Sequence, residues 1–474
     1  MAGGKMIPFL DQLHAEVRHA GMRAAIGLLV GLAILAALPY IPMLNLPLIS
    51  DDYDQINKAR IYGPASGWPA LSRDALYRCR ATSLVLTHWT EELLGIHPVV
   101  LHASSVLLHI LNTWLVFALG LWPRIGWRVS ATAAVFFAVY HGHHEAVTWY
   151  AAVPELLVFF CTAAGFLLWI GWLHAPGLLA NAAVALCFML ALLSKESGVA
   201  LVPLIVGALI VERGDWLGKL PRLLPVASLA VLYFAWTYVN RAEHRHFGDG
   251  TFSLHAPVLL TLLRSSARMF WFWGLISLVV LLLLGARRWS FVLSAAFVWV
   301  IVGLLPYAFL TYMPFVPSRH TYLASAGLAL VVAAASVELF GRFRQSHRWL
   351  AVLLAAVVVV HNCGYVWTKK RAQMMARAAP TEALVSFAQR TNSPIYLHCF
   401  PYAPEVALLA VEIRTGKPRD TVRWDPVVGN PGPGGACWSL QPASSAATGH
   451  ASSASEERGR SIDETILSRG VSHD

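Results

Sequence analysis

The chain has 474 residues, of which 57% are apolar and 13% are charged, and its mean hydropathy is +0.56. This composition excludes a soluble globular protein and indicates a polytopic membrane protein. The formal net charge of +10 does not indicate nucleic acid as a partner, because many of the basic residues stand in short connections between apolar segments. Six cysteines without a CxxC pair predict neither a disulfide framework nor a zinc site.

Apolar runs long enough to cross a hydrocarbon layer of roughly 30 Å recur along the sequence. We interpret the first run as an uncleaved anchor and not as a signal peptide, because Asp51 and Asp52 follow too closely for a cleavable leader. We expect an all-α membrane domain of about eleven helices, at residues 21–40, 99–121, 130–140, 149–173, 178–194, 197–212, 222–240, 269–285, 290–310, 321–340 and 349–367.

Basic residues predict the orientation. With the N-terminal stretch 1–20 in the cytoplasm, most connections expected on the inner side are short and basic, as the positive-inside rule requires. They carry Arg124, Arg128, Arg213, Lys219, Arg222, Arg287, Arg288, Arg342, Arg344 and Arg348. We therefore expect an integral protein of the bacterial inner membrane, with the N-terminus cytoplasmic and the C-terminus extracytoplasmic.

Three further regions follow from composition. Within the transmembrane domain 21–367, the outer loop 41–98 is long enough to fold on the membrane surface. Residues 368–427 predict a small extracytoplasmic α/β appendage, whose expected elements are the helices Thr381–Arg390 and Glu405–Arg414 and the strand Ile395–Phe400. Gly, Pro, Ser and Ala dominate residues 428–474, which have too little apolar surface to offset the entropy of ordering, so we predict a disordered tail.

An acidic cluster follows the first apolar run directly: Asp51, Asp52 and Asp54. Like charges this close raise one another's pKa, which suits a general base. An adjacent Asp pair also suits a divalent cation such as Mg or Mn, the only cofactor that we expect. A cluster that merely caps a short helix is the alternative, and the residues leave it open.

Histidines and acids also gather between two apolar runs, at His141-Gly142-His143-His144-Glu145, with Glu155 in the run that follows. Titratable groups at the membrane rim are costly, which favours a functional role. His143 and Glu145 are candidates for an acceptor site or for metal binding. Polar anchoring of the helices, and a structural ion pair at Glu155, are the simpler alternatives.

Three cations are candidates for binding a phosphate. Lys195 lies in a turn on the expected outer side, against the positive-inside trend, and Arg319 stands beside Tyr322 at the start of a span. An ammonium and an arginine fork both suit a lipid-linked phosphate whose tail lies in the bilayer. Arg80 precedes a His-rich entry to the second span. A solvated turn for Lys195 and contact with headgroups for Arg319 are the alternatives.

Taken in order, these residues resemble the GT-C glycosyltransferase superfamily, and within it the bacterial relatives of the tetratricopeptide-repeat transmembrane O-mannosyltransferases. The resemblance covers roughly residues 20–340. No tetratricopeptide repeats follow the membrane part, and Tyr140-His141 stands where the family has His-Pro. The motifs that carry the resemblance are Asp51-Asp52, Arg80 before the His-rich entry, His-x-Glu-Ala-Val-x-Trp at 143–149, Glu155-Leu156-Leu157, Lys195-Glu196 and Arg319-x-x-Tyr322.

The resemblance implies a glycosyltransferase that moves a sugar from a polyprenyl-phosphate donor to an acceptor hydroxyl on the extracytoplasmic face, with inversion. It implies Asp51 or Asp52 as the general base. The donor phosphate would be bound by Lys195, Arg319, Arg80 and Tyr322, while His143, Glu145 and Glu155 would serve the acceptor or a metal. The acceptor, whether protein, lipid or glycan, stays open, and membrane lipids are expected partners.

Two other functions compete. In a membrane transporter or lipid flippase, the outer acidic and histidine residues would bind cations or relay protons. It ranks second because the acidic residues cluster at the rim and not at mid-span, and because the sequence has no convincing internal repeat. The third alternative is a catalytically inactive scaffold that presents the appendage.

Overall fold

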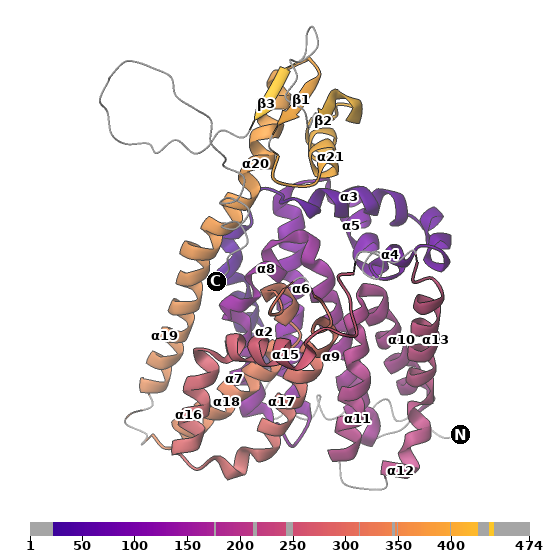
Figure 1. Ribbon diagram of the computed structural model, residues 1–474. Coiled ribbons are helices and arrows are strands. Elements are labelled where there is room, and N and C mark those ends of the chain that lie inside the picture. The colour runs from indigo at the N-terminus through magenta and orange to yellow at the C-terminus, as the bar shows by residue number, and fades with distance from the viewer. Residues whose placement is uncertain are drawn as a thin grey trace.

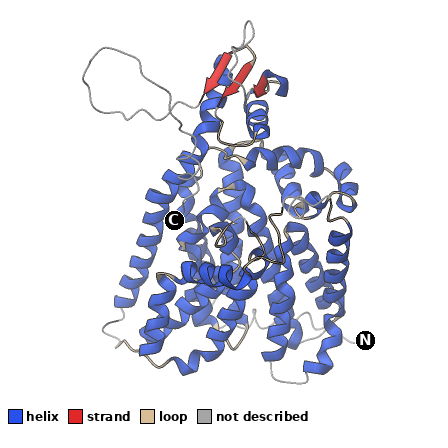
Figure 2. Ribbon diagram, viewed as in Figure 1, coloured by secondary structure: helices blue, strands red, loops and turns tan. Residues whose placement is uncertain are grey.

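The computed structural model describes residues 22–174, 177–211, 216–242, 250–311, 313–343, 347, 349–398, 400–424 and 436–439. It is a bundle of helices that carries a small sheet at one end (Figures 1 and 2). The predicted cytoplasmic stretch 1–20 lies outside the described residues.

Every apolar run expected to span the membrane contains a helix. Six helices in the described ranges are long and apolar enough to cross a membrane, or up to seven if a bent pair counts as one span, and four more are apolar but shorter. The protein is therefore an integral membrane protein, and the number of about eleven spans stays a prediction. The helices are α2 (Met22–Ala37), α6 (Pro98–Ala118), α7 (Trp127–Val139), α9 (Val153–His174), α10 (Leu178–Ser194), α11 (Leu201–Val211), α13 (Leu224–Val239), α16 (Trp273–Leu283), α17 (Ser290–Leu304), α18 (Ser325–Gly341) and α19 (Trp349–Tyr365).

Small residues let the central helix α18 pack closely against its neighbours. A Cβ added to Gly327 would lie 2.4 Å from the carbonyl oxygen of Ala296 in α17, and one added to Gly303 would lie 2.9 Å from Ala324. Nearly all of α18 is buried as a result. The short helix η10 (Ser318–Thr321), just before α18, is thereby held in a rigid frame.

The predicted outer loop is folded. It contains α3 (Asp51–Tyr62), α4 (Ala75–Arg78) and α5 (Ala81–Leu94), which lie across one end of the bundle (Figure 1). Asp74 caps α4 by accepting a hydrogen bond of 3.0 Å from the amide of Tyr77. Short helical turns connect the spans at the same end, namely α8 (His144–Thr148), η5 (Tyr150–Ala152), η6 (Glu196–Ala200) and η9 (Leu305–Tyr307).

The helix predicted at 269–285 begins only at Trp273, as α16, and a separate helix that was not predicted precedes it. Helix α15 (Val258–Phe270) is amphipathic and meets α16 at an angle of 81°. It buries Leu262 and exposes Leu259, and it lies across the bundle in Figure 1. Such a helix suits a position along the membrane surface. The four-residue helix α12 (Trp216–Lys219) lies at the opposite end of the bundle from α3.

The last membrane helix is longer than predicted. It does not end at 367 but continues through a π-helical turn, Val366–Lys370, into α20 (Arg371–Arg390), so that the whole helix has 42 residues. At about 1.5 Å per residue it far exceeds the thickness of the hydrocarbon layer. Good helix formers such as Ala, Gln, Met and Arg continue beyond the apolar run. Helix α20 therefore reaches the end of the bundle where α3 lies.

The appendage contains the predicted helices and strand. A parallel sheet comprises β1 (Ile395–His398), β2 (Val422–Trp424) and β3 (Ala436–Ser439), in the spatial order β2-β1-β3. In the sequence, helix α21 (Pro404–Thr415) connects β1 to β2. Strand β3 lies within residues 428–474, which were predicted to be disordered. Its Trp438 is buried in the same cluster as Leu397 of β1, so a short apolar stretch orders that strand. The rest of the predicted tail lies outside the described residues.

Candidate active site

The first turn of α3 is anchored by Asp52. Its fully buried carboxylate accepts hydrogen bonds from the amides of Ile49, at 2.8 Å, and Ala151, at 2.7 Å, and so joins α3 to η5. The preceding Ser50 has a φ of 41°, a conformation that costs a non-glycine residue about 1–3 kcal/mol. Burial raises the pKa of Asp52 to about 7, although the two amides and the charge of Arg377 favour the anion.

Asp51 and Asp54 are less enclosed than Asp52. The Asp51 side chain is exposed and accepts a hydrogen bond of 3.1 Å from the Ser50 hydroxyl. Asp54 forms an ion pair with Lys58 one helical turn further on. The N-terminal turn of a helix stabilises carboxylates, which suits all three positions. Asp51 is the one of the three that is open to solvent and has no cationic partner among the described residues.

Glu145 of α8 joins several elements. Its carboxylate accepts hydrogen bonds from the Ser318 hydroxyl, from the amide of Arg319 at 3.2 Å, and from Nη1 of Arg377 at 3.3 Å. Burial by itself would raise the pKa of Glu145, but His144, Ser318 and the two arginines hold it lower, at about 2. Glu145 is therefore anionic at neutral pH.

Trp149 supports two guanidinium groups. The Cζ atoms of Arg319 and Arg377 lie 4.7 Å and 4.3 Å from the centre of its ring. Cations over an indole face are attracted to it, most strongly where water is partly excluded. The Arg319 guanidinium donates no hydrogen bond to any residue that the structure describes. We call Asp51, Asp52, Glu145, Trp149, Arg319 and Arg377 the rim cluster.

A second polar group is enclosed among the helices. Glu155 of α9 pairs with Lys195, lies 2.5 Å from Nδ1 of His320, and accepts a hydrogen bond of 2.5 Å from the Tyr307 hydroxyl. The Lys195 ammonium lies 3.1 Å from His320 and 4.9 Å from the centre of the Tyr307 ring. Each of these side chains is buried. We call Glu155, Lys195, Tyr307 and His320 the buried network.

Arg80 and Tyr322 are also engaged by protein partners. Arg80 donates to the carbonyl of Cys79 at 2.6 Å and to Glu196 at 3.2 Å. The Tyr322 hydroxyl lies 2.7 Å from Nδ1 of His109 and accepts a hydrogen bond from Asn112 at 3.3 Å.

His143 lies next to Tyr322, with 4.5 Å between the ring centres, and its Nε2 lies 2.7 Å from the Ser325 hydroxyl. Neither ring is exposed to solvent. Both residues lie in the packing below η10.

The arrangement of the helices is similar to that of known membrane glycosyltransferases. ArnT from Cupriavidus metallidurans matches in its apo state with a TM-score of 0.54 and 14% identity, and bound to undecaprenyl phosphate with 0.51 and 16%. Each match covers 82% of this chain and 85% of ArnT. The Archaeoglobus fulgidus oligosaccharyltransferase, tethered to an acceptor peptide with the NVT sequon, matches with a TM-score of 0.50 and 12% identity.

The chain has a GT-C fold. This confirms, at the level of the fold, the resemblance that the sequence predicts. The match covers 84% of this chain but only 64% of the oligosaccharyltransferase chain. No protein-family model matches the sequence, and no curated protein matches it.

Within this GT-C fold, η10 connects the predicted site residues. Ser318 and Arg319 contact Glu145 in the rim cluster, while the next residue, His320, contacts Glu155 in the buried network. Of the residues predicted from sequence, Asp51, Asp52, Glu145 and Arg319 fall in the rim cluster. Lys195 and Glu155 fall in the buried network, and Arg80 lies beside it. His143 and Tyr322 lie in neither cluster but are buried next to each other at the start of α18.

Two members of the rim cluster were not singled out from the sequence. Trp149 stands in the motif at 143–149, where its aromatic ring is a signal for binding a cation. Arg377 lies in a basic helical stretch beyond the last apolar run, and nothing in its local sequence distinguishes it from Arg371 or Arg390. It joins the site only because the long helix continues past the membrane.

The predicted divalent cation finds no matching set of ligands. In the described ranges, no three His, Cys, Asp or Glu side chains gather in a way that could hold a metal ion. Both Asp52 oxygens accept backbone amides, and Glu145 is held by Ser318 and Arg377. These residues do not fit Mg or Mn, so no step is assigned to a metal.

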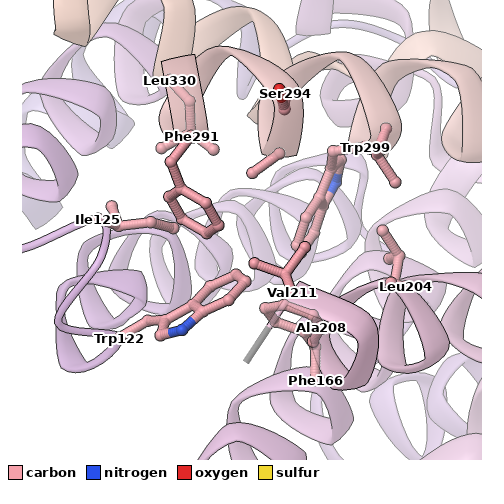
Figure 3. Close-up of a pocket in the computed structure, with 13 residues that line it drawn as sticks. Trp122, Ile125, Phe166, Leu204, Ala208, Val211, Phe291, Ser294, Trp299 and Leu330 are labelled. Carbon is pink, nitrogen blue, oxygen red and sulfur yellow. The ribbon is translucent and has the colours of Figure 1, made fainter. Parts of the chain in front are cut away.

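An apolar pocket of about 80 Å³ lies among α9, α11, α17 and α18 (Figure 3). Trp122, Phe166, Phe291 and Trp299 contribute aromatic rings to its lining. Its walls suit hydrocarbon and not a sugar or a phosphate. The pocket includes none of the rim-cluster residues.

Proposed function

We propose that this protein transfers a sugar from a polyprenyl-phosphate donor to an acceptor hydroxyl at the rim cluster, with inversion at the anomeric carbon. The observation that carries the proposal is the convergence of Asp52, Glu145 and Arg319, which lie in three separate segments of the sequence. The GT-C fold supports it, because the ArnT neighbour is bound to undecaprenyl phosphate.

We assign the general base to Asp51. A base must reach the acceptor hydroxyl within hydrogen-bonding distance, and Asp51 is the exposed member of the pair. Asp52 is buried and its oxygens already accept two backbone amides. In this proposal Asp52 anchors the first turn of α3 and so positions the carboxylate of Asp51.

The donor phosphate is assigned to Arg319. Its guanidinium lies over Trp149 and has no hydrogen-bonding partner among the described residues, so its donors are available to an anion. Lys195 and Arg80 are already paired with Glu155 and Glu196. We assign these two residues, with Tyr322, to positioning η10 and α18.

The chemistry follows from these positions. Asp51 takes the proton of the acceptor hydroxyl as its oxygen attacks the anomeric carbon from the side opposite the phosphate. The bond between that carbon and the phosphate oxygen breaks, and polyprenyl phosphate leaves with the electron pair. A guanidinium at that oxygen stabilises the developing charge. Glu145 holds the arginines in place, and the acceptor, whether protein, lipid or glycan, enters beside Asp51.

Orientation belongs to the same proposal. Helix α3, which begins with Asp51, lies at the opposite end of the bundle from α12, whose last residue is Lys219 and which Arg222 follows closely (Figure 1). Under the positive-inside rule, this arrangement supports our proposal that the site lies on the extracytoplasmic face of a bacterial inner membrane. The alternative is a transporter or lipid flippase whose outer acidic and histidine residues bind cations or relay protons. Among the described residues, no three His, Cys, Asp or Glu side chains gather for a metal cation.

The deciding experiment is sugar transfer in membranes with a polyprenyl-phosphate-sugar donor. We expect Asp51→Asn to insert normally and to lose about 100- to 10,000-fold in rate, the usual contribution of a general base. Asp54→Asn is the matched control, because Asp54 pairs with Lys58 and lies outside the rim cluster. Transfer retained by Asp51→Asn would contradict the assignment of the base, and transfer retained also by Asp52→Asn and the double variant would contradict the site as a whole.

A further inference from the structure

Helix α20 brings an arginine from outside the membrane domain into the rim cluster. Arg377 lies over the Trp149 ring at 4.3 Å and donates to Glu145 at 3.3 Å. Its charge also acts on Asp52. The carbonyl of Arg377 accepts a hydrogen bond from the hydroxyl of Tyr402, which fixes this turn of α20 to the appendage.

The side chains around the Trp149 ring carry more positive than negative charge. Two guanidinium groups, from Arg319 and Arg377, lie over this ring, but only that of Arg377 is paired with a carboxylate, Glu145. The Arg377 side chain is 34% exposed. The remaining donors of the two forks face no described acceptor. Two arginines held on one aromatic ring are arranged in advance for an anion with several oxygens, and a phosphate is the ligand that such forks bind best.

We propose that Arg377 and Arg319 together bind the donor phosphate on Trp149, so that the appendage contributes part of the donor site. This inference rests on the proposed function. Glu145 partners Arg377 in the absence of donor, and the phosphate oxygens take over part of that role when donor binds. Two guanidinium groups then contact the leaving phosphate and stabilise its negative charge as it develops.

Packing of the appendage supports a fixed position for Arg377. Tyr53 and Ile56 of α3 share one hydrophobic cluster with Leu384 of α20 and Val411 of α21. Polar contacts reinforce this packing, with Arg419 donating to Asn57 at 2.7 Å and Arg414 donating to Glu382 at 2.7 Å. Helix α3 with Asp51 and helix α20 with Arg377 are therefore packed against one hydrophobic cluster.

The test is binding of undecaprenyl phosphate to the full-length protein in nanodiscs, measured at one salt concentration, with undecaprenol as the probe that lacks the phosphate. We expect Arg377→Ala to bind undecaprenyl phosphate at least about tenfold more weakly, as expected for the loss of a charge-assisted hydrogen bond. Binding of undecaprenol should not change. The affinity of Arg377→Lys for undecaprenyl phosphate should fall between those of the wild type and Arg377→Ala. Arg390→Ala, at the exposed end of α20, should bind like the wild type.

A purely structural role for Arg377 predicts different results. If it only clamps Glu145, then Glu145→Gln and Arg377→Ala should lower the melting temperature alike and leave undecaprenyl phosphate binding unchanged, which would overturn the inference. We expect instead that Arg377→Ala weakens the binding of undecaprenyl phosphate, whereas Glu145→Gln strengthens it because the Arg377 guanidinium loses its competing carboxylate. If Arg377→Ala does not fold, Arg377→Gln and Arg377→Lys decide by the same comparison.

Failure of the inference is distinguishable from failure of the proposed function. If Arg319→Ala weakens binding of undecaprenyl phosphate and folded Arg377 variants do not, Arg377 is not a phosphate ligand, while the transferase proposal stands. If the wild type shows no preference for undecaprenyl phosphate over undecaprenol, the donor site itself is absent and both proposals fail.

Discussion

The rim cluster and the buried network each combine carboxylate and basic side chains with an aromatic ring, but they differ in how the charges are partnered. In the buried network, Lys195 is paired with Glu155, which also contacts His320 and Tyr307. In the rim cluster, Arg377 is paired with Glu145, the Arg319 guanidinium has no ion pair among the described residues, and both side chains remain partly exposed. The comparison teaches that residue type alone does not mark a ligand site, since a cation binds an external anion only where the protein leaves its donors available.

Breaking the ion pair of the buried network is expected to have the largest effect. Lys195→Met leaves Glu155 as a buried, poorly compensated charge, which costs about 3–5 kcal/mol of stability. The melting temperature of the purified protein measures this loss, and the double variant Lys195→Met/Glu155→Leu should recover part of it. A stable Lys195→Met protein with weakened binding of undecaprenyl phosphate would contradict the comparison, because Lys195 would then act like a rim cation.

The pH dependence of stability tests the anchoring role of Asp52. Its pKa is raised from 3.8 to about 7, so the folded state binds this proton more tightly than the unfolded state. Its contribution to stability is therefore fully present below pH 4 and is lost as the pH rises to about 7, by at most about 4 kcal/mol. Asp52→Asn should lack this dependence.

Melting temperatures between pH 4 and pH 8 provide the measurement for Asp52→Asn. Asp54→Asn serves as the control, because Asp54 is a partly exposed residue paired with Lys58. Equal slopes in the wild type and in Asp52→Asn would show that the buried carboxylate does not govern stability in this range.

Removing the aromatic support of the rim cluster should have the smallest effect. Trp149→Leu removes the ring from under both guanidinium groups, and each cation–π contact is worth about 0.5–2 kcal/mol. We expect undecaprenyl phosphate to bind several-fold more weakly. The Trp149 ring is itself buried in the hydrophobic core, so the melting temperature should fall as well, and binding is measured on protein that remains folded. Trp424→Leu, at an exposed position of β2, is the matched control. Unchanged binding in Trp149→Leu would mean that the ring does not orient the arginines.

Much of the site was predictable because its signals are local. Asp52, Glu145 and Arg319 are polar residues at the ends of apolar runs, and residues that join spans at the same end of a bundle are close in space. Their convergence follows from the order of the helices. Which of Asp51 and Asp52 is exposed does not follow, because the hydrogen bond from the Ala151 amide comes from a segment about a hundred residues away.

The sequence by itself determined the membrane helices, the folded outer loop, the appendage helices and the end of the bundle where the polar residues gather, because hydrophobic run length and helix-forming residues act locally. Tertiary structure alone decided which charges are paired and which remain available. Lys195 is paired with Glu155 because α10 packs along the preceding helix α9 and so brings its C-terminal end to the first turn of α9. Arg377 reaches Trp149 because α19 continues into α20. Pairing and burial are properties of contacts between segments, and no single segment encodes them.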